Sequence, residues 1–205
     1  MKKFLFSFFI LFSVVVSAQT KLGLKLAPII VSNRVANDAQ TADRSGSAFN
    51  LSIGLVVDQP LSDTYMFSSG LVYLPKRAAF KDSDLGVEEE YKVQYLQIPA
   101  TLKLFTNEVA PDFKVFFQVG GGLEIKVFDE SEDPTFTTIN SFNPIDFSVI
   151  LGTGVEYRAG LSTTLFGGIS YQRGLSNVIN EAAVTAAEDL AIRATVVSID
   201  VGVKF

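Results

Sequence analysis

The sequence lacks the two side chains that most often do chemistry at neutral pH, because it contains no cysteine and no histidine. Without cysteine there is no disulfide framework and no thiolate chemistry. Without histidine the chain has neither the usual general base nor the commonest metal ligand. We therefore expect a protein that is not an enzyme, and we assign no catalytic, cofactor-binding or metal-binding residue and no cofactor.

Charge and long apolar runs are also scarce. Only 19% of the residues are charged, below the roughly one quarter of an average soluble domain. Acidic clusters at residues 88–90 and 129–133 lack the ordered spacing of a calcium loop, so we interpret them as solvated loop charge. A membrane-spanning helix needs about 20 apolar residues, and no run beyond residue 18 reaches that length.

The first 18 residues have the organisation of a secretory signal peptide. Lys2 and Lys3 form a basic start, residues 4–16 are an apolar core, and small residues precede Gln19. The apolar core is too short to span a bilayer as a helix. We therefore expect residues 1–18 to be removed and residues 19–205 to form one domain.

The final nine residues alternate in polarity, with apolar side chains at Val197, Ile199, Val201, Val203 and Phe205. A period of two indicates a β-strand with one apolar and one polar face. A strand at the end of the chain would leave an exposed sheet edge, which invites aggregation. We therefore expect it to pair with the first strand and to close a barrel.

The same alternation recurs along the chain and predicts eight strands. They are residues 21–30, 48–58, 65–74, 91–105, 113–128, 145–158, 162–172 and 197–205. The connections alternate between long and short, so all the long loops share one rim, and the short turns share the other rim with both termini. The predicted fold is all-β, an eight-stranded antiparallel up-and-down transmembrane β-barrel, with extracellular long loops and periplasmic termini.

Three places in this pattern carry predictions of their own. The apolar parity changes between Tyr95 and Leu96, and Pro99 cannot donate to a ladder, so we expect a bulge or a break there. Gly160 is predicted as the left-handed residue of a tight hairpin. The sequence that begins at Asn180 resembles a helix cap and first turn. It is compatible either with a short helix or with an irregular alanine-rich loop.

Alternation alone does not say which face of the barrel points outward. Glycines concentrate on the polar face, at residues 23, 54, 70, 120, 122, 152, 154, 168 and 202, as a narrow eight-stranded lumen requires. The apolar face is too bulky for that lumen and carries aromatic residues near both ends, which is typical of a membrane barrel. We therefore place the apolar face in lipid. The alternative is a soluble periplasmic lipocalin-like barrel that binds an apolar ligand.

Most charged residues of the strands lie on the polar face and therefore point into the lumen. A buried charge needs a partner. We expect an internal ion-pair network formed by Lys25, Lys103, Lys126, Glu124, Asp146, Glu156 and Asp200. We interpret this network as a structural plug and not as a proton or ion path.

Three stretches together resemble the PorT-like outer-membrane β-barrel family, which shares the architecture of the small OmpA and OmpX barrels. They are Gly70-Leu71-Val72-Tyr73 followed by Lys76, Tyr95-Leu96-Gln97-Ile98-Pro99, and Tyr171-Gln172-Arg173-Gly174-Leu175-Ser176-Asn177. The resemblance implies an outer-membrane location and, for some members, a role in protein secretion. It supplies no catalytic residues.

The sequence therefore predicts an integral outer-membrane protein without a catalytic site. It would act as a structural, surface-interaction or protein-secretion accessory component. Phe205 resembles the terminal aromatic residue that barrel-assembly machinery recognises. The expected partners are outer-membrane lipid, the assembly machinery through Phe205, and other envelope or secretion proteins through the long loops, with no nucleic acid.

Overall fold

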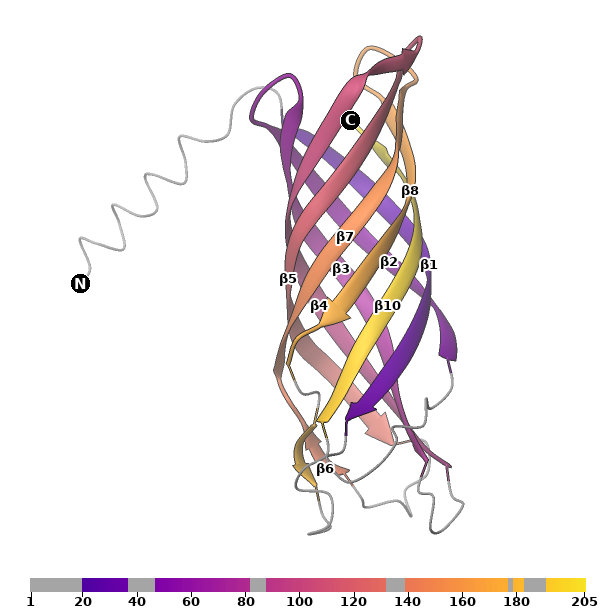
Figure 1. Ribbon diagram of the computed structural model, residues 1–205, viewed down its shortest axis with the longest axis vertical. Helices are drawn as coiled ribbons and strands as arrows, with labels where there is room; N and C mark the ends of the chain where they lie inside the picture. The colour runs from indigo at the N-terminus through magenta and orange to yellow at the C-terminus, as the bar shows by residue number, and fades with distance from the viewer. Residues whose placement is uncertain (1–19, 37–46, 82–87, 132–138, 177–178, 183–190) are drawn as a thin grey trace, which may run out of the picture.

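A computed structural model describes residues 20–36, 47–81, 88–131, 139–176, 179–182 and 191–205, which form ten β-strands (Figure 1). Eight of them make a closed barrel: β1 (Lys21–Ala36), β2 (Ser47–Pro60), β3 (Tyr65–Lys81), β4 (Glu88–Ala110), β5 (Phe113–Ser131), β7 (Ile145–Arg158), β8 (Thr164–Gly174) and β10 (Ala191–Lys204). β6 (Ile139–Phe142) and β9 (Ile179–Ala182) form a separate two-stranded sheet. In these residues no helix is long and apolar enough to cross a membrane. The predicted signal peptide lies outside the described residues.

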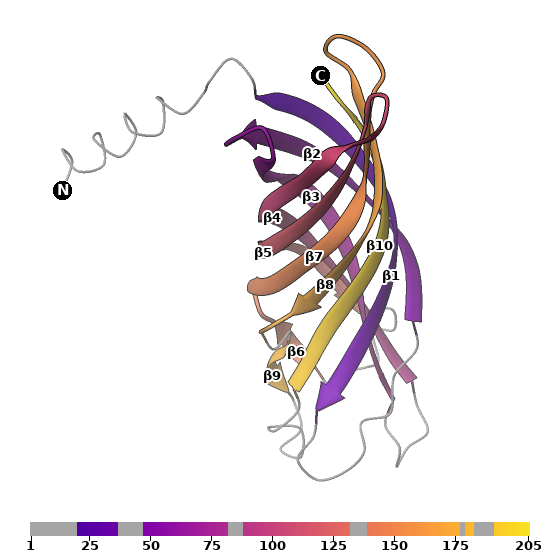
Figure 2. The ribbon, with the colours of Figure 1, turned by 45° about the horizontal axis from the view of Figure 1, so that its top comes forward.

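The barrel closes between its first and last strands, as predicted. All neighbours pair antiparallel in the order β1-β10-β8-β7-β5-β4-β3-β2, and the seam runs from Gly23 opposite Lys204 to Ala36 opposite Ala191. Leu22 and Phe205 exchange both backbone hydrogen bonds, at 3.1 and 2.8 Å. The start of β1 and the C-terminus lie at the end with the short turns, and we call this the short-turn end (Figure 1). The opposite end, with β6 and β9 beyond the rim, is the long-loop end (Figure 2).

Several strands reach further toward the long-loop end than predicted. β1 continues to Ala36, β10 begins at Ala191, and β3 and β4 stay paired as far as Lys81 opposite Glu88. These extensions lack a period-two apolar pattern, so the sequence indicated loops. β9 contains Asn180, so a helix cap at that residue is wrong.

The exterior of the wall is apolar on every barrel strand. This confirms the prediction that the apolar face of each strand points outward. Exposed aliphatic and aromatic side chains include, one per strand, Leu24, Leu55, Phe67, Ile98, Val119, Leu151, Ile169 and Val201. The alternating residues are buried and largely polar, for example Ser52, Thr101 and Ser198. A ligand carrier of the lipocalin type needs the opposite arrangement, so that alternative is rejected.

Aromatic side chains mark both ends of the exterior, as predicted. Tyr65, Phe113, Tyr157 and Phe205 are exposed at the short-turn end, and Phe49, Phe147 and Tyr171 at the long-loop end. Tyr73 is half-buried. The rings of Phe113 and Tyr157 stack at 4.5 Å between centroids. This is the pattern of aromatic girdles at the two membrane interfaces.

Of the two irregularities predicted in β4, the break at Pro99 is present, but the bulge lies on the neighbouring strand β5. Val93, Tyr95 and Gln97 are all buried, so β4 keeps its parity through the predicted flip. Between Gln94 and Tyr95 the register with β5 shifts, which makes Val127 the extra residue of a bulge. The ladder between β3 and β4 is interrupted opposite Pro99, between the pairs Ser69–Ala100 and Val72–Gln97. Proline has no N–H to donate, so the interruption follows from its chemistry.

The prediction for Gly160 is wrong. Among the described residues, positive φ angles occur at Asp112 (64°) and Gly70 (156°). The β7–β8 connection instead closes through hydrogen bonds from Ala159 N and Gly160 N to Thr163 O. The left-handed position lies in the β4–β5 turn at Asp112, because aspartate tolerates this conformation better than most residues.

Lumen glycines make room for two aromatic rings. Phe116 and Phe166 are buried inside the barrel. A Cβ atom at Gly154 would lie 2.7 Å from Phe116 Cζ, and one at Gly202 would lie 2.4 Å from Phe166 Cζ and 2.2 Å from the Leu24 carbonyl oxygen. Glycine on the inner face therefore leaves room for these rings, as predicted for a narrow lumen.

Gly202→Ala should destabilise the barrel by about 1–3 kcal/mol, the usual cost of overpacking. The added methyl group would meet a ring and a backbone carbonyl of the closing seam. Gly167→Ala is the matched control and should stay within about 0.5 kcal/mol, because its Cβ would have no heavy atom nearer than 3.9 Å. Urea titration in lipid vesicles measures both, and equal stabilities would contradict the packing argument.

Candidate functional site

The lumen at the short-turn end contains four buried charges, which we call the short-turn cluster: Asp58, Lys103, Glu156 and Lys204. Lys103 Nζ lies 2.9 Å and Lys204 Nζ 2.7 Å from Asp58 Oδ2. Lys204 also binds Glu156, whose carboxylate is 4.0 Å from Lys103 Nζ. Two acids face two bases, so the cluster is neutral. The Phe166 ring lies beside both ammonium groups, at 5.6 and 5.5 Å.

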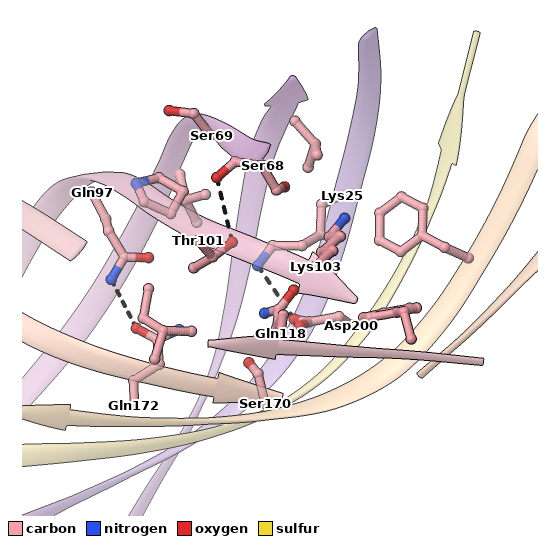
Figure 3. A pocket seen from close by; sticks show the side chains of 16 residues that line it. Lys25, Ser68, Ser69, Gln97, Thr101, Lys103, Gln118, Ser170, Gln172 and Asp200 are labelled. Atoms are coloured by element: carbon pink, nitrogen blue, oxygen red, sulfur yellow. Dashed lines mark hydrogen bonds and ion pairs between the residues drawn. The ribbon is translucent and has the colours of Figure 1, made fainter. Parts of the chain in front are cut away.

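The middle of the lumen contains a small cavity of about 50 Å³ (Figure 3). Its polar lining includes Lys25, Gln97, Thr101, Lys103, Gln118 and Asp200. Lys25 Nζ pairs with Asp200 Oδ1 at 3.4 Å, and Ser198 Oγ donates to the same oxygen at 3.0 Å. A cavity of this size and polarity has room for a few water molecules only.

Toward the long-loop end lie three further buried charges, which we call the Lys76 triad: Lys76, Glu124 and Asp146. Lys76 Nζ donates to Glu124 Oε2 and, at 3.1 Å, to Asp146 Oδ2. Gln97 and Ser148 donate to Glu124 Oε1 at 2.9 and 2.8 Å. Charges from three strands therefore meet in one hydrogen-bonded group.

Beside the triad the lumen is apolar, which the sequence did not predict. The buried cluster consists of Ala27, Ile29, Val31, Leu74, Val93, Tyr95 and Val196. These residues come from β1, β3, β4 and β10 and lie on the inner face. Where the inward-facing and outward-facing residues of a strand are both apolar, polarity no longer alternates along the sequence, so the sequence does not show which residues point inward. We call this group the apolar plug.

The structure brings together most of the predicted network. Lys103 with Glu156, Lys25 with Asp200, and Glu124 with Asp146 all lie in the lumen groups described above. Lys126 is an exception, because it pairs with Asp129 at 3.0 Å toward the rim. The sequence-based prediction of the network omitted Asp58, Lys76 and Lys204. All three have the same signal, because each lies at an inward-facing position of its strand.

The arrangement fills the lumen with paired charges, packed rings and aliphatic side chains. In the part of the chain that the structure describes, no three side chains of metal-binding type converge on one point. The Gln97 amide also donates to Gln172 Oε1 at 2.8 Å, across the long-loop side of the cavity (Figure 3). The small cavity thus lies between two layers of buried, bonded side chains.

We expect the purified protein to conduct no ions at the level of a porin. Eight-stranded barrels leave an interior that side chains fill, and here both layers around the cavity are held by buried ion pairs. Recordings from planar bilayers measure this directly. Stable open-channel currents of porin size would contradict the packed lumen.

A family model described as "Outer membrane protein beta-barrel domain" matches residues 17–180. The chain belongs to this family. Its fold is accordingly that of an integral outer-membrane β-barrel, in agreement with the closed sheet and the apolar exterior. No curated protein matches the sequence significantly.

Solved structures of outer-membrane barrels are similar to this chain at low sequence identity. Neisserial surface protein A is 15% identical, with a TM-score of 0.48, covering 89% of this chain and 97% of that one. Ail of Yersinia pestis is 12% identical, with a TM-score of 0.39 and coverages of 90% and 98%. The N-terminal barrel of Pseudomonas aeruginosa OprF is 11% identical, with a TM-score of 0.44 and coverages of 89% and 97%.

Inward-facing residues of the three stretches that resemble the PorT-like family meet in the lumen. Lys76, from the first stretch, lies 4.8 Å from the centroid of the Tyr95 ring in the second. Gln97, also from the second, donates to Gln172 in the third. Membership of that narrower family stays a prediction; the contacts show only that residues of the three stretches meet inside this barrel.

Proposed function

We propose that this outer-membrane barrel acts through its ends, as a non-enzymatic structural, surface-interaction or secretion-accessory protein. The observation that carries the proposal is the filled lumen. A path for solute would have to break the short-turn cluster, which holds four buried charges, and also the Lys76 triad. The side chains of the lumen therefore stabilise the barrel, and partners bind to its rims or to its lipid-facing surface.

We further propose that the long-loop end faces the cell exterior and binds other envelope or secretion proteins. The β6–β9 sheet supports this assignment, because its residues pair with each other through Ile139–Ala182 and Phe142–Ile179 and not with the barrel wall. A barrel does not need such a sheet for closure. Paired backbone beyond the rim offers a shaped surface to a partner.

Cysteine labelling tests this orientation without background, because the chain has no cysteine. Asp129→Cys places a thiol at the long-loop end, and Asp63→Cys places one in the β2–β3 turn; both aspartates are exposed. A membrane-impermeant maleimide applied to intact cells should label position 129 and leave 63 unlabelled until the outer membrane is opened. The reverse pattern would place the long loops in the periplasm.

Site-specific crosslinking tests the partner. A photo-crosslinking residue at Ser141 in β6 should capture a defined envelope protein in living cells, whereas the same residue at Ser62 in a short turn should not capture that protein. The captured protein should then bind the purified barrel and bind less to a variant that lacks residues 139–142. Equal binding to the shortened barrel would contradict the role of this end.

We also propose that the C-terminal strand delivers the chain to the barrel-assembly machinery through Phe205. Its side chain is 61% exposed on the outer face, at the end of the seam. Phe205→Ser should slow assembly in cells, while Phe49→Ser, at an aromatic residue that is 73% exposed at the other end, should slow it less. The rate at which the heat-modifiable form appears measures both, and equal rates would reject a special role for Phe205.

A further inference from the structure

Two exposed arginines are neighbours on the outer face of the wall, toward the long-loop end. Arg173 lies near the end of β8 and Arg193 near the start of β10, and both side chains are exposed. Arg173 is directly opposite Thr195 in the β8–β10 ladder, so Arg193, two residues along β10, is its diagonal neighbour on the same face. Such neighbours are about 7–8 Å apart, which long side chains can bridge. We call these two residues the arginine pair.

The arginine pair lies at the edge of the apolar band. Arg173 is one outer-face position beyond Tyr171, an exposed residue of the aromatic girdle at the long-loop end. Arg193 is two outer-face positions beyond the exposed Val197, with Thr195 between them. Aromatic girdles mark the interfaces between membrane and water. The arginine pair therefore lies at the depth of the lipid headgroups.

No acidic side chain neutralises the arginine pair in the part of the chain that the structure describes. The residues opposite Arg173 in its two ladders are Val149 and Thr195, which carry no charge. The residue opposite Arg193 is a third arginine, Arg34 of β1. Like charges at directly opposite positions of a sheet destabilise it. The long-loop ends of the adjacent strands β1, β10 and β8 therefore form a basic surface that lacks a counter-charge among the described residues.

The exposed arginine at the opposite end of the barrel differs in this respect. Arg158, at the end of β7, lies 3.8 Å from a carboxylate oxygen of Glu108 and 3.8 Å from one of Asp112. Its charge is thus compensated within the protein. The arginine pair, in contrast, is open to a negatively charged ligand, and Arg158 provides a matched control.

We propose that the arginine pair binds the phosphate group of an anionic lipid in the membrane leaflet at the long-loop end. A guanidinium group is always charged and can donate two parallel hydrogen bonds to one phosphate. The exposed side chains of Tyr171 and Val197, on the membrane side of the pair, would contact the acyl chains of the same lipid. A lipid therefore matches both the charged and the apolar part of this surface, whereas a soluble anion or an acidic peptide matches the charge alone.

This lipid site goes beyond the proposed function, because it needs no protein partner. It lies at the long-loop end whichever way that end faces. A test in vesicles therefore depends neither on the orientation of the barrel in cells nor on a partner at the β6–β9 sheet.

Fluorescence quenching tests the proposal on the intact barrel. The chain contains no tryptophan, so Tyr171→Trp provides a single reporter next to Arg173. The protein is folded into phosphatidylcholine vesicles that contain a small fraction of phosphatidic acid with brominated acyl chains, because bromine quenches tryptophan on contact. This lipid should quench the reporter more strongly than the same fraction of brominated phosphatidylcholine, which has no net charge.

The preference for phosphatidic acid at position 171 should fall about fivefold in Arg173→Gln, the usual contribution of one basic residue near an anionic membrane surface. It should fall about fivefold again when Arg193→Gln is added. Arg158→Gln is the matched control and should leave this preference unchanged. A second reporter, Tyr157→Trp beside Arg158, should show no preference, because acidic residues already pair with Arg158. Heat-modifiable gel mobility shows that each variant is folded.

Equal quenching of the reporter at position 171 by the two brominated lipids would overturn the proposal. A preference that the double variant retains in full, or that the reporter at position 157 shares, would have the same consequence. Inorganic phosphate identifies the source of the anion. If it abolishes the preference and sodium chloride at the same ionic strength does not, the arginine pair binds free phosphate and not a lipid.

Discussion

Asp58→Asn should lower the free energy of unfolding by about 3–5 kcal/mol, the usual cost of breaking a buried ion pair. Asp58 is fully buried and accepts hydrogen bonds from both Lys103 and Lys204. Asparagine keeps the size of the side chain but removes its charge. Two buried ammonium groups would then share Glu156 alone, and the short-turn cluster would hold an uncompensated positive charge.

Urea titration in lipid vesicles, with the folded fraction read from gel mobility without boiling, measures this loss. Asp63→Asn is the matched control, because Asp63 is exposed in a short turn and its loss should change stability by less than about 0.5 kcal/mol. Adding Lys103→Met to Asp58→Asn restores neutrality and should recover part of the stability. If Asp58→Asn is as stable as the control, the short-turn cluster does not stabilise the short-turn end of the barrel.

The wall of the barrel could be predicted from sequence because one physical signal reports it. Each strand crosses lipid on one face and a polar lumen on the other, so apolar and polar residues alternate, as at Val197 to Phe205. The seam between β1 and β10 then follows from the need to pair both edges. The prediction fails where the signal stops: the extensions of β1 and β3 are paired through their backbones, and backbone pairing leaves no polarity pattern.

The lumen was predictable only in part, for reasons of geometry. Parity places Asp58, Lys103 and Glu156 on the inner face, but only the tilt and stagger of the strands bring them to one level. Lys76 lies beyond the predicted third strand, residues 65–74, because the strand in the structure continues to Lys81. The apolar plug gave no signal, since Ile29 and Ile30 are both apolar and only the structure shows that Ile29 is buried and Ile30 exposed.

Val119→Arg should cost about 2–4 kcal/mol, the price of a charge at the middle of the bilayer. Val119 lies halfway along the β5–β7 ladder, which runs from Phe113 to Ile125, and its side chain is 46% exposed on the outer face. Val127→Arg is the matched control on the same strand. Val127 is 54% exposed but lies toward the long-loop end, where arginine should cost only about 0–1 kcal/mol.

Stability alone does not identify lipid around Val119, because a soluble barrel would also resist arginine in its core. Single spin labels at Val119→Cys and Gln118→Cys separate the two cases. Oxygen concentrates in the bilayer interior and a water-soluble nickel complex does not enter it, so a label at 119 should collide often with oxygen and rarely with nickel. A label at 118 should be restricted and shielded from both, because Gln118 lines the small lumen cavity. Free access of nickel to 118, beside a label at 119 that neither reagent reaches, would place the apolar face inside and exclude a membrane barrel.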